Sequence, residues 1–264
     1  MTSFSPERCA ASLMGARRVP RTLRRALTPL PPGARPGTMA EGIAAQVALA
    51  QLSDSAAPAG FKIGATAARM QDYLGLDGPA AGFMPRAGLH GSGSTLAYAP
   101  FFCPGVECEI AVHLIHDLPP GPCSPDKAAA AVDVVMAAIE IVENRYPDLK
   151  DFGTPSLIAD QVFHAAAILG APVSDWKGLD LAEIVGELTV DGVVKGTGMG
   201  RELLGHPMEA LAWLAASAEA AAFGGLRAGQ VVMLGSVCPP VWLDGPATIE
   251  VRFALLPPVT LALV

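Results

Sequence analysis

The chain of 264 residues carries a net charge of −7 at pH 7, and 51% of its residues are hydrophobic whereas 16% are charged. This composition is typical of a compact globular protein with a sizeable core, and the acidic balance argues against a nucleic-acid partner. No apolar run reaches the roughly 18 residues that a membrane span needs, and the five cysteines show no Cys-x-x-Cys spacing, which favours the reducing cytoplasm over a disulfide framework or a zinc site.

The N-terminal segment is basic and predicts helices. Seven arginines fall in the first 36 residues against one acid. An Arg-rich, acid-poor leader is also typical of an organelle transit peptide, but we favour an amphipathic helix over residues 5–16 or an arm that contacts another subunit. Thr38 and Glu41 have the spacing of a capping box, which predicts a second helix over residues 39–52. We therefore expect a helical arm over residues 1–59.

The first expected strand, residues 60–66, places Lys62 between two large apolar residues and two glycines. Glycine permits close approach of the backbone to a ligand, and the pKa of a lysine amine responds strongly to burial. Lys62 is therefore a candidate catalytic or substrate-anchoring group. The alternative is a lysine that protects an edge strand from aggregation. A short helix over residues 67–74 and a loop-rich segment over residues 75–93 follow.

A Pro-Gly break then precedes an alternating run over residues 104–112, which predicts a strand. Because residues two apart in a strand point to the same face, Glu107 and Glu109 project side by side, about 7 Å apart along the backbone. Val106 and Ile110 face the other way. The two carboxylates repel each other unless water or a cation lies between them.

A third acid, Glu140, lies in the apolar run of residues 138–142, which is expected to form a strand after a helix over residues 125–138. A lone carboxylate is costly to bury. Three carboxylates without a histidine or cysteine partner suit Mg²⁺ or Mn²⁺ more than zinc. The alternative is that all three lie on solvated strand faces, and the spacing alone leaves both interpretations open.

The remaining elements alternate between strands and helices. Asp191-Gly192 predicts a hairpin over residues 187–195 with a type I′ turn, Asp180 marks a further helix start, and a leading proline predicts a long Ala-rich helix over residues 207–223. Because strands predominate after residue 60, the expected fold class is α+β with a mostly antiparallel or mixed sheet. Closing strands are expected over residues 230–234, 248–253 and 259–264.

Several of these stretches together resemble the fumarylacetoacetate hydrolase superfamily, in its branch of 2-keto-4-pentenoate hydratases and 4-oxalocrotonate decarboxylases. They appear in the order typical of the family and span nearly the whole chain. The matching stretches are residues 60–66; 74–77 with Pro79 and Gly82; 107–109; 138–142 with Arg145 and Tyr146; 159–160; 204–207 with 212–215; and 228–229 through 234–236.

The resemblance implies a β-rich mixed sandwich or roll as the catalytic domain, over residues 60–264, and a homo-oligomer. It implies that three glutamates hold Mg²⁺ or Mn²⁺ and that a lysine and an aspartate act on the substrate in a pocket lined by small and polar residues. The implied metal ligands are Glu107, Glu109 and Glu140, the implied catalytic residues are Lys62 and Asp160, and the implied substrate-binding residues are Gly64, Gln161, His164, Gly235 and Ser236.

The chemistry implied is that of a divalent-metal-dependent lyase acting on a small-molecule 2-oxo acid. The substrate offers its carboxylate and keto oxygen as a chelating pair, and a divalent ion that binds both stabilises the enolate formed when CO₂ or a proton leaves. Decarboxylation of a 4-oxalocrotonate-like substrate is the main expectation and hydration is the alternative. A C–C hydrolase or isomerase in a specialised pathway, or a non-catalytic subunit that partners a paralogue, are further alternatives.

The chain departs from the resemblance at two places. Hydratases of the family tend to carry an aspartate where this chain has Ala80, a candidate acid–base for water addition, so its absence favours decarboxylation. Bulkier residues replace small ones at Gln161-Val162-Phe163-His164, which suggests a larger or more apolar substrate, or loss of the ordinary activity. His206 has the His-x-x-Glu spacing of the hydrolase branch, but the following proline favours a helix cap.

Overall fold

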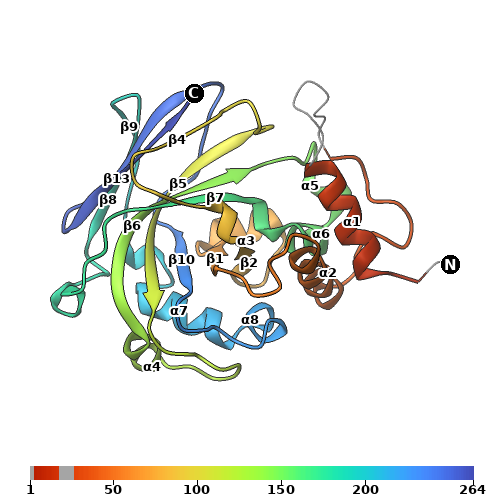
Figure 1. Ribbon diagram of the computed structural model, residues 1–264, viewed down its shortest axis with the longest axis horizontal. Helices are drawn as coiled ribbons and strands as arrows, with labels where there is room; N and C mark the ends of the chain where they lie inside the picture. The colour runs from red at the N-terminus through yellow and green to blue at the C-terminus, as the bar shows by residue number, and fades with distance from the viewer. Residues whose placement is uncertain (1–2, 18–26) are drawn as a thin grey trace.

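The computed structural model describes residues 3–17 and 27–264, which form two β-sheets with helices around them (Figure 1). In this part of the chain one sheet has eight strands, in the order β2-β1-β10-β5-β6-β7-β3 with β11 beside β5, and the other has the order β4-β13-β12-β8-β9. The first sheet contains β1 (Gly60–Gly64), β2 (Ala80–Met84), β3 (Leu89–Gly91), β5 (Pro104–Leu114), β6 (Val132–Glu143), β7 (His164–Leu169), β10 (Val231–Ser236) and β11 (Val241–Trp242). The second contains β4 (Ser94–Leu96), β8 (Val185–Val190), β9 (Val193–Met199), β12 (Ala247–Phe253) and β13 (Leu256–Leu263).

The main core lies between these two sheets. Ile110 of β5 belongs to the same buried cluster as Val251 of β12 and Val259 of β13. Because side chains alternate along a strand, Glu107 and Glu109 lie on the face of β5 that points away from this core. Both sheets mix parallel and antiparallel pairs, since β1 runs parallel to β10 and β4 runs parallel to β13. The expected α+β, β-rich mixed sandwich or roll is confirmed.

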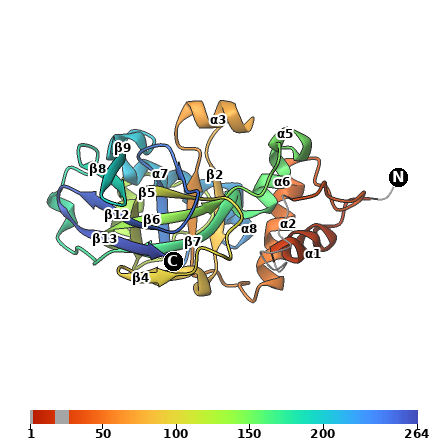
Figure 2. The same cartoon turned by 90° about the horizontal axis from the view of Figure 1, so that it is seen from above.

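The helices lie around the two sheets. In both views α1, α2, α5 and α6 lie together at the N-terminal end of the molecule, whereas Figure 2 shows α3 projecting from one side of the sheets. Single 3₁₀ turns lie at Arg86–Gly88, Trp176–Gly178 and Gly200–Glu202. The helices are α1 (Pro6–Arg17), α2 (Met39–Leu52), α3 (Ala68–Leu74), α4 (Pro125–Ala130), α5 (Leu149–Phe152), α6 (Thr154–Ala159), α7 (Pro207–Ala216) and α8 (Ala218–Ala222).

The N-terminal helices form where the sequence predicted them, and they pack on the sheet. The Thr38–Glu41 capping box is present at the start of α2. The buried Gln46 of α2 donates from Nε2 to the backbone oxygens of Ala81 (3.1 Å) and Ile158 (2.6 Å). Arg18, Arg21, Arg24 and Arg25 of the basic segment lie outside the described residues, and the division of the chain at residue 59 stays a prediction.

The helix expected over residues 125–138 is shorter than predicted. It ends at Ala130, and β6 begins at Val132 and continues to Glu143. The valines at the start of this segment fit a strand better than a helix because they branch at Cβ, and β6 pairs with β5 along nearly its whole length. The extended strand places Glu140 directly opposite Glu107.

Three other expectations needed correction. The helix expected over residues 207–223 is interrupted at Ser217, whose hydroxyl accepts a hydrogen bond from the N–H of Ala220 (3.1 Å) and so caps α8. The segment over residues 75–93 contains β2 and β3, and all five residues of β2 are buried. The small residues of β2 gave no alternating pattern from which to predict a strand. No helix starts at Asp180, which caps a turn instead.

No helix in the described ranges is long and apolar enough to cross a membrane.

The His206 side chain accepts a hydrogen bond from the N–H of Met208 (3.0 Å), so the interpretation of His206 as the cap of α7 is confirmed.

Candidate metal centre and substrate cavity

Three carboxylates meet on the face of the first sheet that points away from the main core. Glu107 and Glu140 are direct partners across β5 and β6, and Glu109 follows on the same face. One oxygen from each of the three lies within 4.8 Å of the others. Glu109 and Glu140 are fully buried, and Glu107 is partly buried. This spacing allows one cation to contact all three carboxylates.

The cluster has more negative charge than the surrounding residues neutralise. Burial and the charge of Glu140 raise the pKa of Glu107 to about 8, and burial with the same charge raises the pKa of Glu109 well above its usual value. Glu109 Oε1 and Glu140 Oε2 are buried without a hydrogen-bond partner. Hard oxygen ligands with spare lone pairs and unbalanced charge fit a divalent cation such as Mg²⁺, Mn²⁺ or Ca²⁺.

Two nitrogen groups hold Glu140 in place. Lys62 Nζ lies 3.3 Å, and His164 Nδ1 2.9 Å, from Glu140 Oε1. Although burial acts to raise the pKa of Glu140, the charge of Lys62 and the contact with His164 hold that pKa below its usual value. Lys62 is only 2% exposed, and β1 lies between β2 and β10. The alternative of an edge-strand lysine is therefore wrong.

A cavity of about 810 Å³ opens beside these groups. Lys62, Gly64, Glu107 and Ser236, all singled out in the sequence, line it. The sequence gave no sign that α3 and the segment after β10 would also contribute, because neither contains a chemical motif and only the fold brings them to the cavity. Their side chains at the cavity include Arg69, Met70, Tyr73, Cys238, Pro239 and Trp242.

Gly235 supports the cluster from β10. Its N–H donates to Glu109 Oε2 (3.0 Å), and its φ of +110° favours glycine. A Cβ at this position would stand 2.6 Å from the Thr66 side chain. Gly235 therefore acts on Glu109 through its backbone, whereas Ser236 reaches the cavity.

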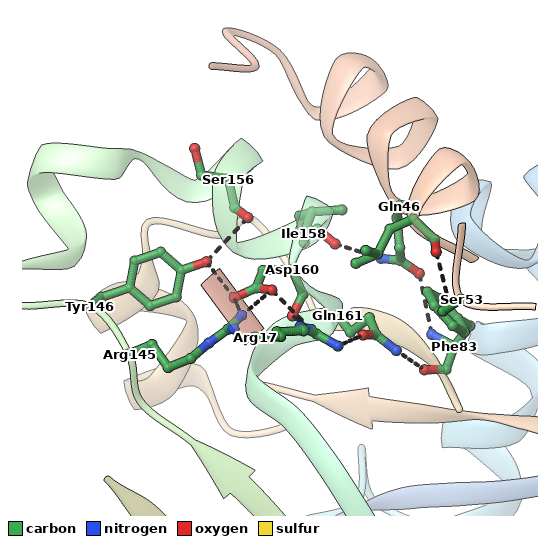
Figure 3. A network of polar contacts seen from close by, with 11 residues as sticks. Arg17, Gln46, Ser53, Phe83, Arg145, Tyr146, Ser156, Ile158, Asp160 and Gln161 are labelled. Carbon is green, nitrogen blue, oxygen red and sulfur yellow. Dashed lines mark hydrogen bonds and ion pairs between the residues drawn. The ribbon is translucent and has the colours of Figure 1, made fainter. Parts of the chain in front are cut away.

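Asp160 lies in a buried ion-pair network, shown in Figure 3. Its carboxylate accepts hydrogen bonds from Arg145, from Arg17 Nη2 (2.8 Å) and from the Tyr146 hydroxyl (3.1 Å). Although burial acts to raise the pKa of Asp160, the charges of Arg145 and Arg17 hold it below its usual value. Asp160 lines a second, smaller cavity of about 160 Å³ with Arg145 and His164. This position fits support of the site, and a direct catalytic role for Asp160 stays a prediction.

Gln161 extends the same network toward the sheet. Its Oε1 accepts from Arg17, and its Nε2 donates to the backbone oxygen of Phe83 (2.7 Å), as Figure 3 shows. Both ends of the amide are thus used within the protein. Gln161 is buried and is not among the residues that line either cavity, so a substrate contact for Gln161 stays a prediction.

We expect Asp160→Asn to lower the free energy of unfolding by about 3–5 kcal/mol, because Arg145 then stays buried without its countercharge. Denaturant unfolding measures the loss. The matched control is Glu183→Gln, which removes the half-exposed ion pair with Arg201 and should change the free energy of unfolding by less than about 1 kcal/mol. If both substitutions lowered the free energy of unfolding equally, the buried Asp160 network would stabilise the protein no more than an exposed ion pair does.

Residues 62–262 match the protein family described as Fumarylacetoacetate (FAA) hydrolase C-terminal. The chain belongs to this family. It is 33% identical over 200 residues to 2-hydroxyhexa-2,4-dienoate hydratase of Comamonas testosteroni, covering 75% of this chain and 73% of that protein. It is 28% identical over 194 residues to 4-oxalocrotonate decarboxylase of Pseudomonas putida, covering 74% and 73%.

The fold of this family member also resembles a solved structure over its full length. The 4-oxalocrotonate decarboxylase from Pseudomonas putida G7, complexed with magnesium and adipate, superposes with a TM-score of 0.87, covers 100% of both chains and is 23% identical. The family match and the 33% identical relative confirm the resemblance to the fumarylacetoacetate hydrolase superfamily inferred from the sequence, and the solved structure agrees with it in fold.

Proposed function

We propose that this protein is a divalent-metal-dependent lyase that acts on a 2-oxo acid and removes CO₂ from a 4-oxalocrotonate-like substrate. The observation that carries the proposal is the cluster of Glu107, Glu109 and Glu140, whose excess negative charge lies next to a cavity and a buried amine. Mg²⁺ or Mn²⁺ would be held by these three glutamates. Relatives of the chain are hydratases and decarboxylases, which supports a lyase reaction.

A bound divalent ion supplies Lewis acidity toward the carboxylate and keto oxygens of a 2-oxo acid. In decarboxylation the bond to the departing carboxylate breaks, its electron pair moves through the conjugated chain toward the keto oxygen, and CO₂ leaves. Lys62 is buried beside Glu140 and lines the cavity, so its ammonium group can stabilise this developing negative charge. Lys62 can also return a proton to the carbon chain.

Ala80 favours loss of CO₂ over addition of water. It lies on β2, is fully buried and pairs with Gly64 of β1, which is two residues beyond Lys62 on the same strand. An alanine supplies no acid or base there to activate water. Hydration of a 2-keto-4-pentenoate-type substrate is the second candidate, because the chain shares greater identity with a hydratase than with a decarboxylase.

In the test, the purified protein is loaded with Mg²⁺ or Mn²⁺ and is incubated with one of two substrates. One is a conjugated dicarboxylic 2-oxo acid, and the other is a conjugated monocarboxylic 2-oxo acid. We expect CO₂ release from the first, loss of this activity on addition of a chelator, and recovery on return of the metal. Water addition to the monocarboxylic compound without CO₂ release would favour the hydratase candidate. Inactivity on both despite bound metal would support a non-catalytic subunit that partners a paralogue. The homo-oligomer expected from the sequence stays a prediction.

A further inference from the structure

Three consecutive residues between α6 and β7 have left-handed backbone conformations. The φ angles of Gln161, Val162 and Phe163 are +61°, +52° and +67°. Residues other than glycine rarely adopt this backbone region, and a β-branched residue such as Val162 is particularly strained in it. Such strain persists where the surrounding structure enforces it, and it occurs often at functional sites.

The surrounding strands enforce this turn, which we call the 161–163 turn. The Gln161 amide is fixed at both ends, and its backbone oxygen stands 2.5 Å from where a Cβ on Gly82 would lie. Val162 Cγ1 lies 3.0 Å from the corresponding point on Gly64. The turn therefore packs closely on β1 and β2 only because both positions are glycine, and it holds one conformation.

The 161–163 turn presents two apolar side chains at the reaction centre. Val162 Cγ1 and Lys62 Nζ lie 3.0 Å and 3.2 Å from the point where a Cβ on Gly64 would stand, so the methyl group and the buried amine border the same space. The Phe163 ring packs edge-to-face on Tyr146 with centroids 5.7 Å apart. Val162, Phe163 and Tyr146 all line the 810 Å³ cavity. A 2-oxo acid head at the glutamates and Lys62 would thus direct its carbon chain along this apolar wall.

Phe163 also lines the smaller cavity of about 160 Å³. That cavity is lined by Asp160, Arg145 and His164, which are polar or charged. The ring therefore stands between an apolar substrate wall and a polar space. Removal of the ring would join the two and lengthen the room available to the carbon chain.

We propose that Val162 and Phe163 are specificity-determining residues, which contact the carbon chain of the substrate beyond its 2-oxo acid head and limit the length and bulk of that chain. This assignment rests on the proposed function, because it requires the head to bind at the glutamate cluster. It names the substrate class as 2-oxo acids whose carbon chain is apolar where it adjoins the keto group, because Val162 and Phe163 line the cavity there.

The test measures, by calorimetry in saturating Mn²⁺, the affinities of oxalate (a head without a chain), 2-oxopentanoate (a short chain) and 2-oxo-4-phenylbutanoate (a bulky chain). For Val162→Ala and Phe163→Ala we expect oxalate affinity within twofold of wild type and 2-oxopentanoate affinity about tenfold weaker, since one apolar group in a pocket has an effect of this size. Phe163→Ala should also shift preference at least tenfold toward the phenyl compound, and Phe163→Leu should restore part of the original preference.

Matched controls are Val193→Ala and Phe102→Ala, which remove the same side chains at exposed positions that line neither cavity. Equal weakening of all three ligands in the Val162 and Phe163 variants, or unchanged affinity for 2-oxopentanoate, would overturn the assignment while leaving the proposed function in place. Failure of the wild-type protein to bind oxalate in a Mn²⁺-dependent manner is a different result, and it would overturn both.

Discussion

Glu109→Gln should weaken Mn²⁺ binding by about 100-fold or more and abolish metal-dependent turnover. Residues that only orient metal ligands already contribute 10- to 100-fold to affinity, and this substitution removes one of three anionic ligands. The fold should remain, because the amide oxygen can still accept from the Gly235 N–H and a neutral amide is less costly to bury beside Glu140 than a carboxylate. Calorimetric titration of the metal-free variant measures the affinity, and thermal unfolding checks the fold.

Glu219→Gln is the matched control. Glu219 is also a buried glutamate that accepts a backbone hydrogen bond, from the N–H of Ala81 (3.4 Å), but it lies outside the cluster. This variant should keep the metal affinity of the wild-type protein. Unchanged Mn²⁺ affinity in Glu109→Gln would remove the core of the proposed function.

Lys62→Ala should lower turnover by about 10²- to 10⁴-fold, the range for loss of a positioned acid or base. Its effect on Mn²⁺ affinity should be small by comparison, because Lys62 contacts Glu140 without offering a ligand to a cation. Steady-state rates at saturating metal measure the loss of turnover without the effect of weaker Mn²⁺ binding. Because Lys62 is buried, unfolding must be followed in parallel.

The exposed Lys127 on α4 offers a control, since Lys127→Ala removes the same amine at a position that lines neither cavity. That variant should retain full turnover. Wild-type turnover in Lys62→Ala would show that the role assigned to this amine is wrong, even if the metal site is correct.

The sequence predicted the parts of the site that follow from strand geometry. The alternation of Glu107 and Glu109 predicted that they share a face, and the apolar run around Glu140 predicted a strand, so the chemistry of the three carboxylates could be anticipated. Their convergence could not, because it depends on the register that places Glu140 opposite Glu107. That register is a property of the pairing of β5 with β6. A shift of β6 by one residue against β5 would move Glu140 to the opposite face of the sheet from Glu107 and Glu109.

Long-range contacts set the limits of prediction elsewhere. The pairing of Arg145 with Asp160 could not be predicted, because it requires the packing of α6 against the sheet. The small residues of β2 gave no strand pattern, although Gly82 is needed for the close approach of the 161–163 turn. Val162 and Phe163 stood out in the sequence as unusually bulky, but only the backbone conformation shows that they reach the cavity.

The most direct test of the central claim is calorimetric titration of the metal-free protein with Mg²⁺ and Mn²⁺, with and without oxalate as a mimic of the enolate. We expect one divalent ion to bind per chain and to tighten oxalate binding, because the ion and the three glutamates together form the site for the 2-oxo acid head. Absence of metal binding, or oxalate affinity that does not depend on metal, would contradict the account.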